Sequence, residues 1–224
     1  MSLLEATIGW LAPPQCVCCG QEGPCLCIGC SISEIVPYGQ HCWLCNRAAP
    51  GGRTCVSCRP GSPRHVWITT NYGGAAQNLI KIYKFGHLRA AAPAISELML
   101  QTLSDFGIDQ SLARLNYLIV PVPTATSRLR RRGFGHSELL ADRVASRLSL
   151  QSANVLGRLG QSRQLGAKRS VRLESAKDNY FVRQPQIVKD RNILLIDDVA
   201  TTGATIRGAT KVLRRAGARR IDAL

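Results

Sequence analysis

The chain has no apolar run near the length that crosses a bilayer, which takes about 20 residues. Its first 14 residues lack the basic start and the continuous apolar core of a secretory signal peptide. These two absences predict a cytoplasmic protein. The chain also lacks the Gly-Lys-Ser or Gly-Lys-Thr sequence of a P-loop, which argues against a phosphate site of that kind.

Acidic residues are scarce, with 14 Asp and Glu against 29 Lys and Arg, so the net charge is +15. Residues 1–70 carry four Arg and three Glu, whereas residues 71–224 carry 25 basic and 11 acidic residues. The excess positive charge therefore belongs to the later part. It favours polyanions or highly phosphorylated ligands, although such charge also promotes solubility.

Cysteine is absent after Cys58 and abundant before it. Four Cys-x-x-Cys pairs stand out, and two such pairs complete a tetrahedral zinc site. Disulfides are the alternative, but a reducing cytosol disfavours them. Cys18 and Cys25 are left over, and either can replace a neighbour as ligand. The spacing predicts two zinc ribbons in sequence, with the ligand sets Cys16, Cys19, Cys27 and Cys30, then Cys42, Cys45, Cys55 and Cys58.

The sequence Pro-Gly-Ser-Pro at residues 60–63 indicates a boundary. We predict a Cys-rich zinc-binding module over residues 1–64 and an α/β domain over residues 65–224, a length that suits one such domain. Apolar patterns in the second part predict strands and helices, with Ser137 as the N-cap of one helix. The strands are expected at 66–70, 117–120, 180–182, 193–196 and 218–224, and the helices at 79–83, 88–103, 137–148 and 206–216.

Residues 191–206 combine a buried parallel strand, two carboxylates, a hydroxyl-rich loop and the start of a helix. The helix N-terminus offers unpaired N–H groups and a positive dipole, which suit a phosphate. Gly203 lets the backbone approach an anion closely, and the threonines add hydroxyl donors. Asp197 and Asp198 can accept hydrogen bonds from two sugar hydroxyls or position Mg²⁺.

This stretch predicts a sugar-phosphate site rather than the ordinary strand–loop–helix connection of any α/β protein. It resembles the phosphoribosyl-pyrophosphate (PRPP) motif of type I phosphoribosyltransferases. The residues predicted to bind PRPP are Asp197, Asp198, Ala200, Thr201, Thr202, Gly203, Ala204 and Thr205.

Three further features suit anionic ligands. Four arginines beside an aromatic ring, after the strand at 117–120, suit phosphates or a nucleic-acid backbone, and a solvated basic turn is the alternative. Residues 158–177 form a long polar stretch, which is typical of a mobile functional loop. A lysine at a helix end can face an anion, although such a charge is usually solvated. These residues are Arg128, Arg130, Arg131, Arg132 and Phe134, then Arg158, Arg163, Gln164, Arg169 and Arg172, and Lys84.

Together these pieces resemble the ComF family of competence-associated proteins, which join a Cys-rich zinc module to a phosphoribosyltransferase-like domain. The resemblance spans nearly the whole chain and includes the sequences Lys-Phe-Gly at 84–86, Val-Pro-Val-Pro at 120–123 and Arg-Gly-Phe at 132–134. The family continues that last segment with Asn-Gln, where this chain has Gly135 and His136. In the 158–177 stretch, Ser162 and Ser175 stand where the family has Thr and Asn.

The resemblance implies a parallel sheet of the type I phosphoribosyltransferase kind, with helices on both faces, preceded by a double zinc ribbon. It makes residues 128–132 the pyrophosphate-facing loop and residues 158–177 the flexible active-site loop, with Mg²⁺ between pyrophosphate and ribose. It also implies a role in natural transformation, in which single-stranded DNA would lie along the 128–132 loop, with other DNA-uptake proteins as partners.

Three functions stay open at this point. The first is a DNA-handling protein that binds PRPP. The second is an active Mg²⁺-dependent phosphoribosyltransferase with an unknown acceptor and with Asp197 and Asp198 as catalytic residues, although the sequence shows no recognisable nucleobase pocket. The third is a PRPP-dependent signal to a partner docked on the zinc module.

Overall fold

The computed structural model describes residues 13–86, 89–123, 135–158 and 180–224. Its centre is a sheet of four parallel strands in the order β2 (Gln151–Ser152), β1 (Leu118–Pro121), β5 (Asn192–Ile196) and β6 (Arg220–Ala223). Two further strands, β3 (Leu156–Arg158) and β4 (Tyr180–Val182), form a separate antiparallel pair. Among the described residues, no helix is both long enough and apolar enough to span a bilayer.

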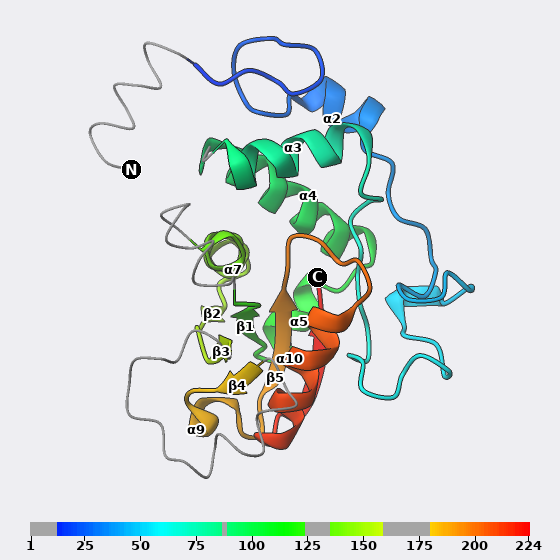
Figure 1. The fold of residues 1–224 in the computed structure, drawn as a ribbon, viewed down its shortest axis with the longest axis vertical. Coiled ribbons are helices and arrows are strands. Elements are labelled where there is room, and N and C mark those ends of the chain that lie inside the picture. The colour runs from blue at the N-terminus through cyan, green and yellow to red at the C-terminus, as the bar shows by residue number, and fades with distance from the viewer. Residues whose placement is uncertain (1–12, 87–88, 124–134, 159–179) are drawn as a thin grey trace.

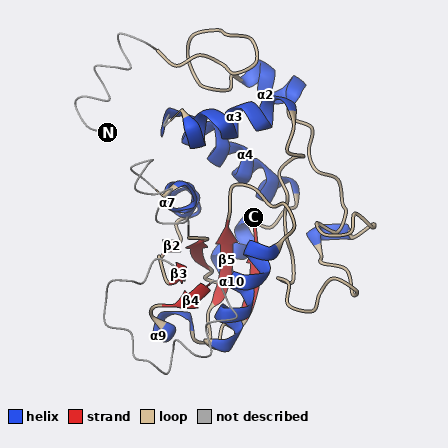
Figure 2. Ribbon diagram, in the orientation of Figure 1, coloured by secondary structure: helices blue, strands red, loops and turns tan. Residues whose placement is uncertain are grey.

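Helices cover both faces of the sheet, as the sequence predicts (Figures 1 and 2). Side chains alternate along a strand, so Leu194 and Leu195 of β5 enter different hydrophobic clusters. Leu194 packs in one cluster with α3 (Gly74–Phe85), α4 (Ala92–Asp105) and α7 (His136–Leu148). Leu195 packs in the other cluster with α10 (Ala204–Arg215).

The remaining elements are short. The expected helix over 88–103 is described as a 3₁₀ turn, η2 (Arg89–Ala91), followed by α4, and Pro93 occupies the first turn of α4, where no N–H is needed. The sequence patterns did not predict β2, β3, α5 or α9, which are too short to show a periodic pattern. The short helices of the described residues, besides η2, are α2 (Ile28–Glu34), η1 (Pro50–Gly52), α5 (Asp109–Arg114) and α9 (Pro185–Val188).

The strand expected over 66–70 exists only in part. Val66 forms a parallel bridge with Ala223, and the Trp67 N–H donates to the Ala223 carbonyl at 2.9 Å. The Arg64 N–H donates to the Ile221 carbonyl at 2.9 Å. Residues 64–67 therefore extend the sheet beside β6. The chain then turns to a second, antiparallel bridge at Thr70, so the ladder is too short to form a regular strand.

A buried carboxylate fixes this edge of the sheet. Asp222 has a fully buried side chain and accepts hydrogen bonds from the His65 N–H at 2.9 Å, the Tyr117 hydroxyl at 2.6 Å and Arg220 Nε at 2.7 Å. Burial alone would raise the pKa of Asp222, but hydrogen bonds from His65 and Tyr117 and the charge of Arg220 lower it.

The Cys-rich part shares both hydrophobic clusters with the sheet. Cys16, Cys25 and Leu26 belong to the cluster of α3, α4 and α7, whereas Cys42 and Trp43 belong to the cluster of α10. The predicted boundary between residues 64 and 65 thus lies within a continuous packing arrangement, and the division into two domains stays a prediction.

Candidate functional site

The acidic pair lies where a parallel sheet of this kind presents its ligands, at the carboxyl end of a central strand. β5 ends at Ile196, and Asp197 and Asp198 follow it, both partly buried. The Asp197 N–H still donates to the Leu224 carbonyl at 3.2 Å, and the Asp198 N–H donates to Asp197 Oδ1 at 3.1 Å. The two carboxylates are therefore held by the end of the sheet rather than by a free loop.

Lys84, in the last turn of α3, forms an ion pair with this site. Its Nζ lies 2.8 Å from Asp198 Oδ1, and the two side chains are 20% and 9% exposed. Lys84 therefore neighbours the acidic pair and neutralises one of its carboxylates, and its contact with an anionic ligand stays a prediction. The energy of this contact is less screened than that of a surface pair because both groups are largely buried.

Asp197 has an unusual protonation equilibrium. Burial, followed by the negative charge of Asp198, raises its pKa to about 8, while Lys84 and hydrogen bonds from the Asp198 N–H and the Ser137 side chain act in the opposite direction. Asp197 is thus largely protonated at neutral pH. A cation that binds this carboxylate must first displace the proton, whereas a sugar hydroxyl can bond either form.

Ser137 was predicted as the N-cap of its helix, and that prediction is wrong. α7 begins at His136 with Gly135 as its N-cap, and no side chain caps it. Ser137 is buried, and its side chain bonds Asp197 instead. The hydroxyl thus contacts a buried carboxylate, where a hydrogen bond contributes more than at an exposed helix end.

The loop after the acidic pair presents its polar groups outward. Thr201, Thr202 and Ala204 are exposed. Within the described residues, the N–H groups of Thr201, Thr202 and Gly203 donate to no other atom. They precede α10, a helix of 12 residues, so unpaired donors and the positive end of the helix dipole coincide. This arrangement can bind a phosphate.

Gly203 is in close contact with the Cys-rich part. It has φ of +73° and is buried, and a Cβ there would lie 2.7 Å from Trp43 and Leu44. Both the backbone conformation and the neighbouring ring thus require glycine. The second cysteine group therefore supports the loop that precedes α10. Sequence reasoning missed Trp43, although a tryptophan between two Cys ligands of a small module is a usable signal for a packing contact.

A cleft of about 250 Å³ adjoins the acidic pair. Its wall is formed by Asp197 and Asp198, by apolar side chains of α3 and α4, and by aromatic side chains from the Cys-rich part and from residues 66–72. Two of these rings are anchored by indole hydrogen bonds, Trp43 Nε1 to Thr54 Oγ1 at 3.1 Å and Trp67 Nε1 to the Gly51 carbonyl at 3.3 Å. The cleft can accept a flat apolar group beside the carboxylates.

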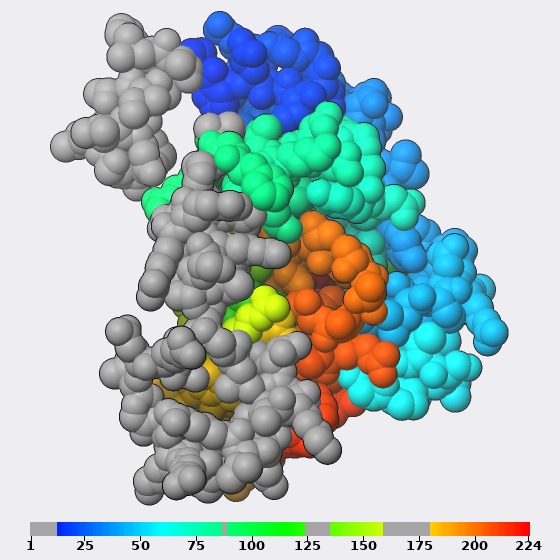
Figure 3. Space-filling model, in the orientation of Figure 1, coloured from blue at the N-terminus to red at the C-terminus, as the bar shows by residue number. Residues whose placement is uncertain are grey.

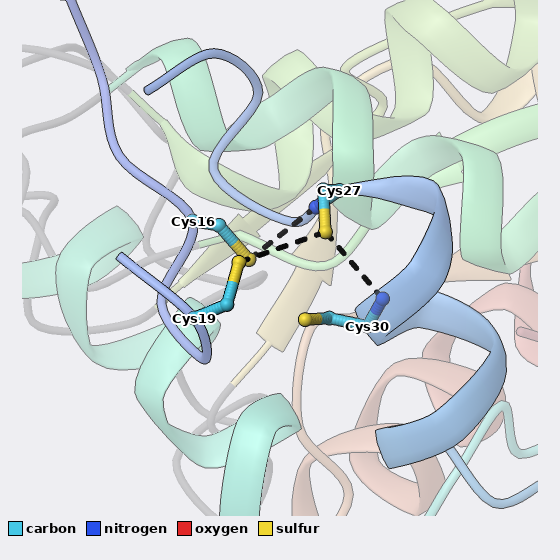
Figure 4. A group of neighbouring side chains, drawn as sticks. All are labelled: Cys16, Cys19, Cys27 and Cys30. Carbon is cyan, nitrogen blue, oxygen red and sulfur yellow. Dashed lines mark hydrogen bonds between the residues drawn. The ribbon is translucent and has the colours of Figure 1, made fainter. Parts of the chain in front are cut away.

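The structure brings together the first predicted cysteine set (Figure 4). Its four Sγ atoms lie within 4.8 Å of one another, and Cys19 Sγ and Cys27 Sγ are 3.9 Å apart. Tetrahedral zinc with bonds of about 2.3 Å places sulfurs about 3.8 Å apart, so the group fits the ion. Backbone N–H groups, first that of Cys19 and then that of Cys27, lower the pKa of Cys16 to about 6, which favours the thiolate that a metal binds.

The second predicted set, Cys42, Cys45, Cys55 and Cys58, also forms one group of sulfurs within 4.8 Å. Cys45 Sγ and Cys55 Sγ are 3.5 Å apart. Burial opposes the charged form of Cys42, but backbone N–H groups near the sulfur, led by that of Cys55, lower its pKa to about 6. Figure 3 shows the surface around this second group (cyan) lying against α10 (orange to red). Zinc would link loops that are too small to have a core of their own.

The two remaining cysteines stay outside both groups. Cys18 is exposed, whereas Cys25 is fully buried in the cluster of α3, α4 and α7. Burial raises the pKa of both thiols, which favours the neutral form. Neither residue replaces a neighbour in the described arrangement.

The predicted basic loops lie mostly outside the described residues. This applies to Arg128, Arg130, Arg131, Arg132 and Phe134, and to Arg163, Gln164, Arg169 and Arg172. Arg158 is described in β3, where it pairs with Tyr180 and its guanidinium lies 5.8 Å from the ring centroid. His136, where the ComF pattern has Gln, is buried, and its Nε2 donates to the Tyr83 carbonyl at 3.0 Å. It thereby joins α7 to the last turns of α3.

Comparison with known proteins gives matches of two kinds. A family model described as "Phosphoribosyl transferase domain" matches residues 135–224. Among curated proteins, "DNA utilization protein YhgH" of Escherichia coli is 28% identical over 87% of this chain and 93% of its own length. "Competence protein ComFC" of Bacillus subtilis is 27% identical over 86% of this chain and 79% of its own. "Competence protein F" of Haemophilus influenzae is 25% identical over 85% of this chain and 79% of its own length.

Proposed function

Since this chain belongs to the ComF family, we propose that it binds PRPP or a related sugar phosphate and handles single-stranded DNA during natural transformation. The observation that carries the first part is the acidic pair at the end of β5, followed by unpaired N–H groups at the start of α10. This combination matches a ligand with a phosphate at one end and a diol at the other. We place this activity in the cytoplasm.

The roles of the residues follow from their positions. The loop over Ala200–Thr205 binds the phosphate of the sugar through N–H groups and hydroxyls. Asp197 and Asp198 accept hydrogen bonds from the ribose hydroxyls, and they are also the residues that would hold Mg²⁺. When bound, Mg²⁺ supplies positive charge that neutralises the pyrophosphate. Asp197 gives up its proton as the ligand binds, and Lys84 exchanges its contact with Asp198 for the ligand's anionic groups.

The DNA-handling part is supported by two observations. The relatives are named for competence and for DNA utilization, and residues 71–224 of this chain carry 25 basic against 11 acidic residues. Such a charge attracts a nucleic-acid backbone. The residues 128–132 and Phe134 remain candidates for the pyrophosphate or for DNA, with other DNA-uptake proteins as partners.

An active Mg²⁺-dependent phosphoribosyltransferase with an unknown acceptor is the alternative. The cleft of about 250 Å³ beside Asp197 and Asp198 favours it, because a flat acceptor held there would face the ribose. The chain's carboxylates would then stabilise positive charge on the sugar as pyrophosphate leaves. Pyrophosphate release from PRPP, measured with a panel of nucleobases and amines, distinguishes turnover from binding alone.

Calorimetric titration with PRPP and Mg²⁺ tests the proposed ligand. We expect binding by the wild type and a loss of affinity of at least about tenfold in Asp197→Asn/Asp198→Asn. Asp190→Asn is the matched control, because Asp190 is exposed and its positive φ of 60° suits asparagine. Equal affinities in the wild type and the double variant would place the ligand elsewhere or exclude it.

A further inference from the structure

A second concave site lies at the opposite end of α10 from the acidic pair. It is a cleft of about 440 Å³, and arginine supplies six of the eight described residues that line it. Arg214 lies ten residues along α10 from Ala204, or about 15 Å at the rise of an α-helix. Arg220 begins β6, at the amino end of a strand, whereas Asp197 follows the carboxyl end of β5. The lining arginines are Arg53, Arg59, Arg64, Arg214, Arg219 and Arg220.

The cleft is built from two parts of the chain that are far apart in sequence. Three arginines come from residues 53–64, in and after the second cysteine group. The other three lie at the end of α10, just before β6 and at the first residue of β6. The first 70 residues carry only four basic side chains, and three of these line this cleft. A basic surface scattered at random over the module would not be so concentrated.

Backbone contacts hold the two walls in place. Arg214 donates to the Ser62 carbonyl, and Arg207 of the same helix donates to the Pro60 carbonyl at 3.3 Å. The Arg64 N–H donates to the Ile221 carbonyl. These contacts join the two walls and fix the Arg214 guanidinium before any ligand arrives, which lowers the entropy cost of binding an anion.

Most of the arginines of the cleft have no acidic partner among the residues that the structure describes. Among the described residues, only Arg220 of the six forms an ion pair, with Asp222 at 2.7 Å. The other five arginines are exposed residues, and like charges that line one cleft disfavour one another. The negative end of the α10 dipole stabilises the positive charge of Arg214. It does not account for the positive charges of the arginines on the opposite wall.

We propose that this arginine cleft binds the phosphate backbone of the single-stranded DNA that the protein handles; the inference rests on the DNA-handling part of the proposed function. Arginine binds phosphate oxygens with two parallel N–H bonds, which suits it to a chain of phosphates. No aromatic side chain of the described residues lines the cleft, so we assign it contacts with the backbone and not with the bases. Its position leaves the sugar-phosphate site at the other end of α10 open.

The test compares two triple variants of the full-length protein that remove the same charge. The cleft variant changes three arginines of the Cys-rich wall to glutamine, and the control changes three exposed arginines outside the cleft. Zinc content and circular dichroism check that both variants fold. The substitutions are Arg53→Gln/Arg59→Gln/Arg64→Gln for the cleft and Arg47→Gln/Arg114→Gln/Arg183→Gln for the control.

Fluorescence anisotropy of a labelled oligo-dT of about 20 nucleotides, measured over a salt series, gives affinity and salt slope. We expect the cleft variant to lose at least about tenfold in affinity and about 2 units of the log–log salt slope, since each phosphate contact on a single strand contributes about 0.7. The control should retain most of both. The loss should be the same on an abasic strand, because only phosphates are contacted.

The outcomes separate this inference from the proposed function. If the wild type binds no oligonucleotide at low salt, DNA handling and the cleft both fail. If the wild type binds but the cleft variant and the control lose affinity equally, only the cleft assignment is overturned. A loss that disappears on the abasic strand would equally overturn it, because the contacts would then be to bases.

Discussion

Lys84 and Asp198 form an ion pair, with 2.8 Å between Nζ and Oδ1, that joins the end of α3 to the carboxyl end of β5. The same lysine opposes the rise in the pKa of Asp197. One side chain therefore pairs with one carboxylate and lowers the pKa of the other. A ligand that takes over the carboxylates also frees Lys84, so the lysine can contact the anionic part of that ligand.

Replacing Lys84 should shift the pH dependence of ligand binding. In Lys84→Met, Asp197 loses the charge that lowers its pKa, so its pKa should rise further above 8. We expect the midpoint for Mg²⁺-dependent PRPP binding to move upward by about one pH unit, measured by titration calorimetry at several pH values. Lys81→Met is the control, because Lys81 lies on the same helix, is exposed and donates from Nζ to Gln77 Oε1 at 3.1 Å. Identical profiles would contradict the role of Lys84.

Asp197→Asn should stabilise the ligand-free protein at alkaline pH. The folded state holds this proton more tightly than the unfolded chain does, because its pKa is about 8 against 3.8. The contribution of Asp197 to the free energy of unfolding therefore falls as the pH rises from about 4 through about 8. We expect the free energy of unfolding of the variant to exceed that of the wild type by at least about 1 kcal/mol at about pH 9. Near pH 4 the two free energies should be equal. Urea unfolding at both pH values measures this, with Asp190→Asn as the control.

The contribution of the buried Asp222 to the free energy of unfolding should change with pH in the opposite direction to that of Asp197. Its folded pKa is lowered, so its stabilising contribution is present above about pH 4 and is lost as the pH falls through the folded pKa. Asp222→Asn should lower the free energy of unfolding by about 3 kcal/mol at neutral pH, since Arg220 loses its buried partner. Asp142→Asn, an exposed position on α7, should change it by less than about 0.5 kcal/mol. A similar cost for both variants in urea unfolding would count against the network.

Zinc content should follow the two cysteine groups. We expect two zinc ions per chain, one fewer in Cys27→Ser, one fewer in Cys45→Ser and no change in Cys18→Ser, measured by atomic absorption on purified protein. Both groups enter the hydrophobic clusters of the sheet, so chelation should also lower the melting temperature of the whole chain. Loss of zinc from the Cys18 variant would show that the ligand set is wrong.

Gly203→Ala should lower the free energy of unfolding by more than the strain of a left-handed backbone accounts for. A Cβ at Gly203 would lie 2.7 Å from Trp43 and Leu44, at a φ of +73°. Gly107 has a similar φ of +64° with nothing within 4 Å, so Gly107→Ala measures the strain without the contact. We expect a loss of about 1 kcal/mol for Gly107→Ala and at least about 1 kcal/mol more for Gly203→Ala, from thermal unfolding. Equal losses would mean that Trp43 moves aside freely.

Local patterns predicted the parts of the site that are contiguous in sequence. β5, the acidic pair and α10 follow one another within residues 192–215, and each cysteine set lies within 17 residues, so their spacing carries the information. The resemblance to ComF proteins added the parallel sheet with helices on both faces. The structure confirms the strand, the helix, the sheet and the two cysteine groups, whereas the ligand roles of Asp197 and Asp198 stay predictions.

The features that sequence reasoning missed depend on tertiary contacts. Lys84 and Asp198 are separated by more than 100 residues, and a lysine at a helix end gives no sign of its partner. Ser137 has the residue type of an N-cap, but a buried carboxylate competes for its hydroxyl. Each arginine of the cleft would look like a solvated charge by itself, since the walls come from segments about 150 residues apart.

The contact between residues 64–67 and β6 also limits the order of events during synthesis. The His65 N–H bonds Asp222, a partner 157 positions later, and Trp67 bonds Ala223. The segment that carries the second cysteine group therefore cannot reach its final place until β6 has left the ribosome. The cysteines emerge before the strands of the sheet, so early capture of metal would protect exposed thiols while the strands are translated. A nascent chain that stalls before β6 would leave β5 and residues 64–67 without their partner strand. Such a chain would be a substrate for chaperones or proteases.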